Sequence, residues 1–242
     1  DKDNPMSVEQ EAKMFVDEIL LFQLTIIFLF YPTSWFFYLF YFFYIIILIF
    51  LKGGNKMIEN IKKVTSNIPL TLQNLLTYII AAFVLAIAAQ ISIPLPNGVP
   101  LTLQTFTVAM IGFCLSTNKG LKTILTYLLL GVIGIPVFAS GKAGFGTLFG
   151  LTGGFILGFI LLVLFCSRTQ KINNFFVKIL FSLFGLASCH FLGILQYSII
   201  SGINLLQSFL LVSLPFLLKD SLSIILALLI SEKLINRKNS YN

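Results

Sequence analysis

The stretch from Leu128 to Phe159 constrains the fold more than any other part of the chain, because it joins long apolar runs to nine glycines. A helix that faces lipid gains nothing from so many glycines, since each one removes a side chain and loosens the backbone. Unwound backbone at membrane depth is tolerated only where it is buried in protein or lines a polar cavity. The stretch therefore predicts a re-entrant or capping loop between two membrane helices, where a small polar ligand is held.

The composition makes the chain a polytopic integral membrane protein. Of its 242 residues, 57% are hydrophobic and only 10% are charged, and a soluble domain of this size could not bury so much apolar surface. The net charge of +7 belongs to loops and helix ends, where it sets orientation in the bilayer, so we expect no nucleic-acid partner. The sequence contains no Walker, HExxH or GxSxG motif and no metal-ligand spacing of cysteines, so we expect no catalytic residue, cofactor or metal, and therefore no enzyme.

The first 56 residues differ from the rest. Residues 1–18 are acidic, and residues 19–51 form an aromatic, apolar run broken at Pro32. One continuous helix of that length would measure about 50 Å, whereas the hydrocarbon core of a bilayer is about 30 Å thick. The run therefore crosses once or forms a tight hairpin. We expect residues 1–56 to be an acidic tail and hydrophobic anchor of one or two helices, either native or a non-native extension, and residues 57–242 to be a six-transmembrane-helix substrate-binding domain.

Six apolar segments predict the helices of that domain. They lie near residues 70–91, 103–115, 121–138, 153–166, 175–200 and 205–230. Basic residues recur on alternate connections, and by the positive-inside rule both ends of the six-helix unit are cytoplasmic. A proline-rich connection at residues 92–104 and the glycine-rich stretch then share the outer face. Two special loops on one face favour a ligand site there over two rigid connectors.

Polar and small residues inside the predicted spans are the remaining candidates for function. Asp220 is an acid at membrane depth, which costs about 2.5–3.5 kcal/mol on insertion scales, so a functional role is favoured over a hydrated interfacial acid. Gln104 lies at the mouth of the second span. His190 is expected to hydrogen-bond a neighbouring helix. Ala82 and Ala86, four residues apart, allow close helix packing, either within this bundle or against a separate subunit.

Three segments resemble the BioY family, the biotin-specific substrate-binding (S) components of energy-coupling-factor (ECF) transporters. They are VPLTLQTF at 99–106, the stretch 128–159, and LPFLLKDSL at 214–222. The resemblance covers about residues 70–233. It implies an all-α six-helix bundle in the cell membrane that binds a vitamin near the outer face. It also implies three kinds of partner besides the lipid bilayer: the vitamin, a transmembrane coupling subunit and two ATPase subunits.

The resemblance also implies the site residues. The expected ligand contacts are Gln104, Lys142, Gly144, Thr152, Gly153, Phe155 and Asp220, and the expected contacts with the coupling subunit are Ala82 and Ala86. The family's last helix typically reads P-G-D-x-x-K, whereas this chain has Lys219 in place of the glycine and Ser223 in place of the lysine. Our hypothesis is that Lys142 or Lys219 supplies the cation missing at Ser223, while Asp220 accepts a hydrogen bond from the ligand.

These departures leave two alternatives to biotin transport open. The first keeps the fold and changes the ligand to another small vitamin. The second is a degenerate transporter that serves as a membrane structural or assembly protein.

Overall fold

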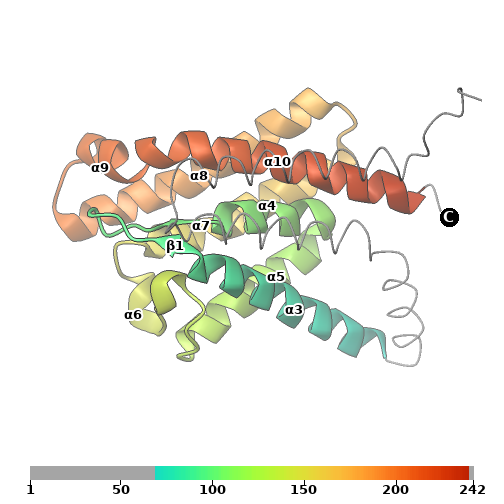
Figure 1. The fold of residues 1–242 in the computed structure, drawn as a ribbon, viewed down its shortest axis with the longest axis horizontal. Helices are drawn as coiled ribbons and strands as arrows, with labels where there is room; N and C mark the ends of the chain where they lie inside the picture. Colours follow the sequence, from blue (N-terminus) through green and yellow to red (C-terminus); the bar gives the residue numbers. More distant parts are fainter. Residues whose placement is uncertain (1–68, 240–242) are drawn as a thin grey trace, which may run out of the picture. The chain divides into compact units, whose positions relative to one another are not determined.

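The computed structural model describes residues 69–239, with side chains described up to residue 235. The expected anchor at residues 1–56 lies outside the described residues. All six predicted spans contain a helix, which confirms the all-α fold (Figure 1). The helices are α3 (Leu70–Gln90), α4 (Gln104–Cys114), α5 (Thr117–Val132), α6 (Phe145–Leu148), α7 (Gly153–Arg168), α8 (Phe175–Ser201), α9 (Leu205–Val212) and α10 (Leu214–Asn239).

The long helices run back and forth between two ends of the bundle. The connections α3–α4, α5–α7 and α8–α9 lie at one end, here called the loop end, on the left of Figure 1. The connections α4–α5 and α7–α8 and the end of α10 lie at the other, basic end. Basic residues gather at this end, among them Lys119, Lys122, Arg168, Lys171, Lys178 and Lys233. The structure thus confirms that the proline-rich and glycine-rich connections share one end.

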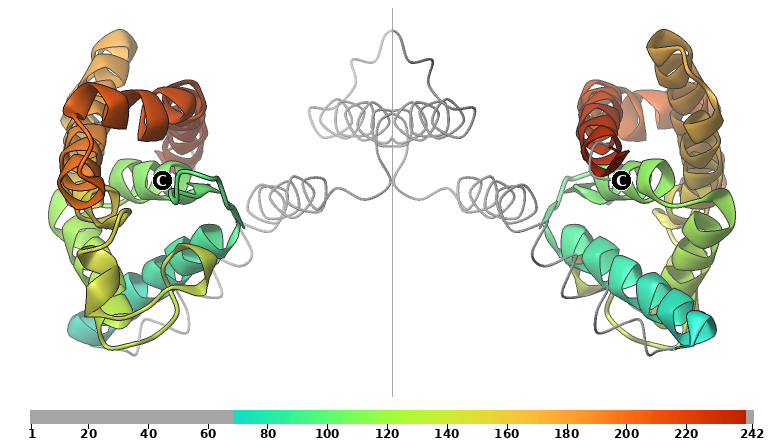
Figure 2. Two further views of the ribbon diagram at one scale, coloured as in Figure 1. Left: turned by 90° about the vertical axis from the view of Figure 1, so that its left-hand side faces the viewer. Right: turned by 90° about the vertical axis from the view of Figure 1, so that its right-hand side faces the viewer.

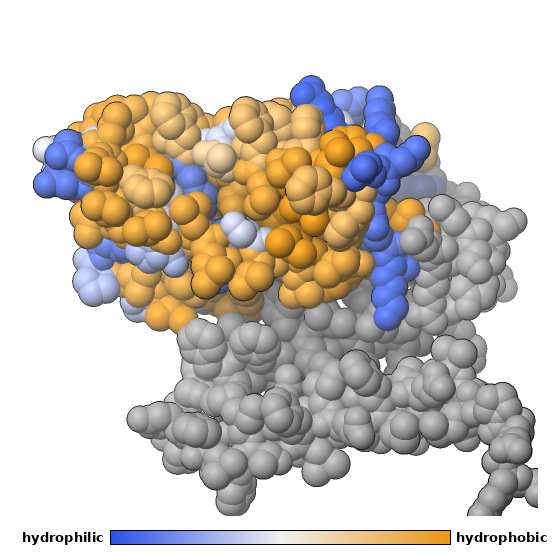
Figure 3. All heavy atoms as spheres, turned by 90° about the horizontal axis from the view of Figure 1, so that it is seen from above, coloured by the Kyte–Doolittle hydropathy of each residue, from blue (hydrophilic) through white to orange (hydrophobic). Residues whose placement is uncertain are grey.

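Four of the described helices are long and apolar enough to cross a bilayer: α3, α7 with the 3-10 turn after it, α8 and α10. Within their most apolar windows only 28–56% of the residues are buried, so most of α3, α8 and α10 faces outward. Figure 3 shows the result on one face, a broad apolar band with hydrophilic residues gathered toward its ends. Such a band fits the hydrocarbon core of a membrane, and the protein is a multi-pass membrane protein.

The predicted last span is two helices rather than one. Helix α9 ends at Val212; the backbone of the next residue, Ser213 (φ −122°, ψ −55°), leaves the helical range, and α10 begins at Leu214. Pro215 has no N–H and is therefore tolerated in the first turn of α10 but not in the interior of a continuous helix. The break places the polar side chain of Ser213 inside the bundle, where it is buried.

The two connections at the loop end have structure of their own. The proline-rich connection contains strands β1 (Ser92–Ile93) and β2 (Leu101–Thr102), which pair antiparallel, Ser92 with Thr102; we call residues 92–102 the Pro-rich hairpin. We call residues 133–152 the Gly-rich loop. It contains the 3-10 turn η1 (Ala139–Gly141) and helix α6. Figure 2 shows both connections at the same end of the bundle, seen from that end on the left.

Glycine lets helices α7 and α8 approach each other closely. A Cβ built on Gly154 would lie 2.2 Å from the carbonyl oxygen of Leu192, and one on Gly158 would lie 2.8 Å from the Cα of Cys189. Lipid gives no hydrophobic drive between helices, so close packing of this kind is what holds them together. Cys189 and Cys166 are buried packing residues, whereas Cys114 is exposed.

Ala82 and Ala86 lie in the core of the bundle. Ala82 is fully buried and Ala86 is 8% exposed, and both belong to the cluster formed with α4, α5 and α7. The exposed side of α3 carries larger side chains, among them Phe83, Val84 and Ile87. The placement favours packing within this bundle over direct contact of the two alanines with a coupling subunit.

Candidate functional site

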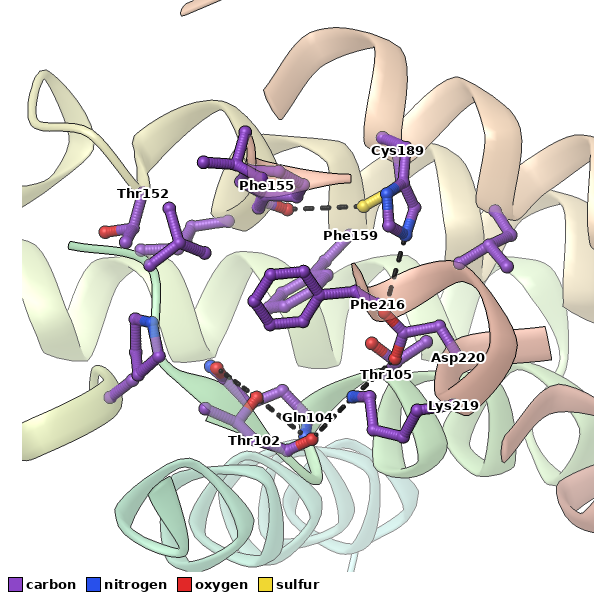
Figure 4. A pocket seen from close by; sticks show the side chains of 17 residues that line it. Thr102, Gln104, Thr105, Thr152, Phe155, Phe159, Cys189, Phe216, Lys219 and Asp220 are labelled. Atoms are coloured by element: carbon purple, nitrogen blue, oxygen red, sulfur yellow. Dashed lines mark hydrogen bonds and ion pairs between the residues drawn. The ribbon is translucent and has the colours of Figure 1, made fainter. Parts of the chain in front are cut away.

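A cavity of about 60 Å³ lies at the loop end, between the Pro-rich hairpin, the Gly-rich loop and helices α4, α7, α8 and α10 (Figure 4). Typical ligand pockets measure about 300–1,000 Å³, so its walls must separate before a vitamin-sized molecule enters. Its lining residues are Val99, Pro100, Thr102, Gln104, Thr105, Ala139, Thr152, Phe155, Ile156, Phe159, Leu186, Cys189, His190, Val212, Phe216, Lys219 and Asp220.

A network of charged and polar groups lies along one side of this cavity. The Asp220 carboxylate is 4% exposed; its Oδ1 forms an ion pair with Lys219 Nζ at 2.5 Å, and its Oδ2 lies 3.4 Å from His190 Nε2. His190 Nδ1 lies 2.8 Å from the hydroxyl oxygen of Ser213, and Lys219 Nζ donates to the carbonyl oxygen of Thr102 at 2.8 Å. This polar network therefore links α8, the α9–α10 junction and the Pro-rich hairpin.

The position of Lys219 explains how the protein tolerates Asp220. An unpaired carboxylate at membrane depth is costly, and a neighbouring ammonium offsets that cost. One of the three N–H donors of the same ammonium bonds to the Pro-rich hairpin, at the carbonyl oxygen of Thr102. The Lys219–Asp220 pair is neutral as a whole, and it presents a strong donor and a strong acceptor next to each other.

Gln104 lines the cavity, but its side-chain amide hydrogen-bonds to other residues of the protein. Its Oε1 accepts from the Thr102 hydroxyl at 3.0 Å, and its Nε2 donates to the Tyr127 hydroxyl at 2.8 Å. Tyr127 in turn donates to the carbonyl oxygen of Val137 at 3.0 Å. This buried sequence of hydrogen bonds ties the hairpin to α5 and to the Gly-rich loop, so Gln104 shapes the cavity as much as it lines it.

The structure brings together four of the seven ligand residues predicted from the sequence: Gln104, Thr152, Phe155 and Asp220 all line the cavity. It does not place the other three there. Lys142 is exposed on the Gly-rich loop, outside the cavity lining.

The two remaining glycines have structural roles instead. Gly144 makes a turn with φ 86°, and its N–H bonds to the carbonyl oxygen of Gly131 at 2.7 Å. Gly153 packs at the start of α7, where a Cβ would lie 1.9 Å from the carbonyl oxygen of Leu148. Of the two candidate cations, Lys219 is the one at the cavity.

Several lining residues carry no signal in the sequence. Phe159 and Phe216 give the cavity an aromatic wall, and the ring of Phe155 meets the His190 ring edge to face at 5.6 Å. The chain has 26 phenylalanines, so sequence alone could not single these out. His190 was expected to hydrogen-bond a neighbouring helix; its partner is Ser213, at the junction of α9 and α10, and it also lies beside Asp220 at the cavity.

The arrangement suits a small molecule with an apolar body and a polar head that both donates and accepts hydrogen bonds. Aromatic and aliphatic side chains supply most of the surface, and a few converging polar groups fix orientation, as in most ligand sites. Within residues 69–235 no group of three His, Cys, Asp or Glu side chains is placed to hold a metal ion.

Comparison with known proteins gives consistent results. The model of the BioY family matches residues 60–240. The probable biotin transporter BioY of Pyrococcus horikoshii is 35% identical over 149 residues, covering 62% of this chain and 88% of that protein. The biotin transporter BioY of Thermotoga maritima is 47% identical over 77 residues, covering 32% of this chain and 45% of that protein. A crystal structure of the S-component for biotin from an ECF-type ABC transporter aligns with a TM-score of 0.61 and 26% identity, over 69% of this chain and 92% of that chain.

Proposed function

The chain belongs to the BioY family, and on that premise we propose that it is the biotin-binding S component of an ECF-type vitamin importer. The observation that carries the proposal is the small cavity with aromatic walls and the Lys219–Asp220 pair on one side. The match to the biotin S-component over 92% of that chain supports the same assignment.

The Lys219–Asp220 pair fits the ureido ring of biotin better than its carboxylate. A ureido group presents N–H donors beside a carbonyl acceptor, so Asp220 accepts from an N–H and Lys219 donates to the carbonyl. A ligand carboxylate at the same place would compete with Asp220 for Lys219 and would bring two negative charges close together in a site of low polarity. We therefore place the ureido ring at this pair.

The other end of the ligand then points across the cavity toward Thr152, which lies on the opposite side from Lys219 in Figure 4. Thr152 precedes the first turn of the 16-residue helix α7. The N–H groups and the dipole of a helix N-terminus favour a negative charge, and the biotin carboxylate supplies one. The aliphatic chain between the two ends packs on Phe155, Phe159 and Phe216.

Binding of labelled biotin to the purified protein tests this assignment. We expect Asp220→Asn and Lys219→Met each to weaken binding about 10- to 100-fold, because each removes a hydrogen bond to a charged group. Lys142→Met is the matched control, a lysine at the same end of the bundle but outside the cavity, and it should leave affinity unchanged. Wild-type protein that retains another vitamin and ignores biotin would refute biotin as the ligand. Unchanged affinity in both cavity variants would refute the site.

A second ligand assignment has one observation in its favour. The cation sits at position 219, whereas the family's last helix typically has it three residues after the aspartate, where this chain has Ser223. A small vitamin with a differently placed carbonyl would suit that shift. Mass spectrometry of the molecule that co-purifies with the protein distinguishes the two ligands directly.

We further propose that the loop end faces the outside of the cell membrane. The basic residues collected at the opposite end support this orientation, because basic connections remain in the cytoplasm. Both ends of the six-helix unit are then cytoplasmic. Cysteine replacements at Ser140 and Thr117, each in a chain whose exposed Cys114 is replaced by serine, test the orientation with a reagent that does not cross membranes: Ser140→Cys should label in intact cells, and Thr117→Cys should label only after lysis.

The remaining partners are a transmembrane coupling subunit and two ATPase subunits that supply the energy. We place the coupling subunit on α3, on the exposed face that Phe83, Val84 and Ile87 form beside the buried Ala82 and Ala86. A large-to-small change at Phe83 should reduce co-purification of the coupling subunit while leaving biotin binding intact. Unchanged co-purification would move the contact to another helix.

A further inference from the structure

Two glutamines from different helices, α3 and α8, hold the Gly-rich loop. Gln90, the last residue of α3, donates through Nε2 to the carbonyl oxygens of Pro136 and Phe138, each at 3.1 Å. Its Oε1 accepts from the N–H of Gly141 at 2.9 Å. One exposed side chain thus fixes three backbone groups on the first half of the loop.

Gln196 holds the second half in the same manner. From α8, its Nε2 donates to the carbonyl oxygens of Leu148 and Gly150, each at 2.8 Å. A Cβ on Gly153 would lie 2.4 Å from that nitrogen, so the glycine is what allows the amide to reach the loop. The two glutamines together make five hydrogen bonds to the loop backbone.

Both attachments lie next to residues that line the cavity. Ala139 directly follows Phe138, whose carbonyl Gln90 binds, and Thr152 lies two residues after Gly150, whose carbonyl Gln196 binds. Neither glutamine lines the cavity itself. The two side-chain amides therefore affect the site indirectly, because they fix the position of the loop that carries Ala139 and Thr152.

We propose that Gln90 and Gln196 are positioning residues that hold the Gly-rich loop closed over the ligand and set the rate at which the ligand leaves. The proposal rests on the function proposed above. The cavity is too small to admit a vitamin without movement of its walls, and withdrawing the loop requires these five bonds to break. Hydrogen bonds of neutral amides are individually weak, so the loop can open without unfolding the helices that carry it.

Gln170 provides a matched control within the same chain. Its Nε2 donates to the carbonyl oxygens of Gly112, Phe113 and Leu115 at 3.0, 2.9 and 2.7 Å. It is exposed, like Gln90, and holds backbone at the end of α4, but at the basic end of the bundle, away from the cavity. Loss of Gln170 removes the same kind of contact without touching the loop.

The experiment measures two quantities in Gln90→Met, Gln196→Met and Gln170→Met, since methionine keeps the length of the side chain and removes the amide. The first is the dissociation rate of labelled biotin after a chase with unlabelled biotin. The second is hydrogen–deuterium exchange of loop residues 137–150 in ligand-free protein. We expect dissociation to speed up about five- to tenfold in each loop variant, as the loss of amide hydrogen bonds predicts. Exchange of the loop amides should speed up as well.

In Gln170→Met we expect wild-type dissociation and wild-type loop exchange, with faster exchange at the end of α4. The proposal is overturned if the loop variants match wild type in both measurements, or if Gln170→Met speeds dissociation as much as they do. Failure of wild-type protein to bind biotin would refute the proposed ligand alone, because the exchange measurement still tests the hold on the loop.

Discussion

The Gly-rich loop and helix α7 follow one another in the sequence, but they need their glycines for different reasons. In α7, Gly154 and Gly158 have helical neighbours so close that a Cβ would lie 2.2 and 2.8 Å from the backbone of α8. In the loop, Gly141 and Gly144 have nothing within 4 Å of a Cβ, but their φ angles are 69° and 86°. The helix needs glycine for space, and the loop needs it for backbone conformation.

The difference teaches that one glycine-rich stretch performs two separate tasks. The helix glycines assemble the scaffold, because they let α7 and α8 pack at short range where lipid supplies no hydrophobic drive. The loop glycines shape the cover of the cavity, because they let the chain turn back on itself between α5 and α7. Substitutions in the two regions should therefore differ in what they damage.

The largest effect is expected from Gly154→Ala. The added methyl group meets the carbonyl oxygen of Leu192, which is helical backbone and cannot rotate away. We expect the free energy of unfolding to fall by about 3 kcal/mol, the upper part of the range for overpacked sites. Thermal unfolding of the purified protein in detergent measures it. Near-wild-type stability would mean that α7 and α8 can move apart to admit the methyl group. The helix glycines would then not be required for space.

A smaller loss of stability is expected from Gly144→Ala. Its backbone (φ 86°, ψ 160°) lies in a region that residues with a Cβ almost never occupy, so a cost of about 1–2 kcal/mol follows even though the space is open. The same unfolding measurement applies. Gly146→Ala is the control, because Gly146 also has nothing within 4 Å but lies in helix α6 without a positive φ. Equal effects at both positions would show that conformation is not what the loop requires.

The smallest effect on folding, with a larger effect on binding, is expected from Gly193→Ala. Its Cβ would lie 2.4 Å from the ring of Phe155, a side chain that can rotate and that lines the cavity. We expect stability to change by less than about 1 kcal/mol and biotin affinity to fall about tenfold, as the ring is pushed toward the ligand. In the Phe155→Leu background the same change should cost little. If the effects of the two substitutions on biotin affinity are fully additive, Gly193 does not act on the site through Phe155.

The scaffold could be predicted well from the sequence, because lipid imposes strong and local rules. Long apolar segments must be helices, and basic residues mark the connections on one side, so six helices and the shared end of the two loops followed directly. The break at Ser213 was missed, since residues 205–218 are mostly apolar on both sides of it and Pro215 alone does not show where a helix ends. The short strands of the Pro-rich hairpin were missed because two-residue strands leave no periodic pattern.

The site was predicted in part. Asp220 stood out because a carboxylate is rare at membrane depth, and Gln104 and Thr152 followed from the resemblance of their segments to the family. Lys142 and Lys219 were equivalent candidates in the sequence, and only the structure places Lys219 at the cavity and Lys142 on the exposed surface. The contacts of the two glutamines with the loop gave no signal, since each glutamine contacts backbone more than 40 residues away.

The sequence by itself determined the membrane character of this protein, its helices and the presence of a glycine-rich connection, because these depend on composition and on local hydrophobic length. The tertiary structure decided which glycines serve space and which serve conformation, which lysine neutralises Asp220, and which amides hold the loop. These depend on distances between helices that are far apart along the chain, and such distances are set by packing and not by any residue alone.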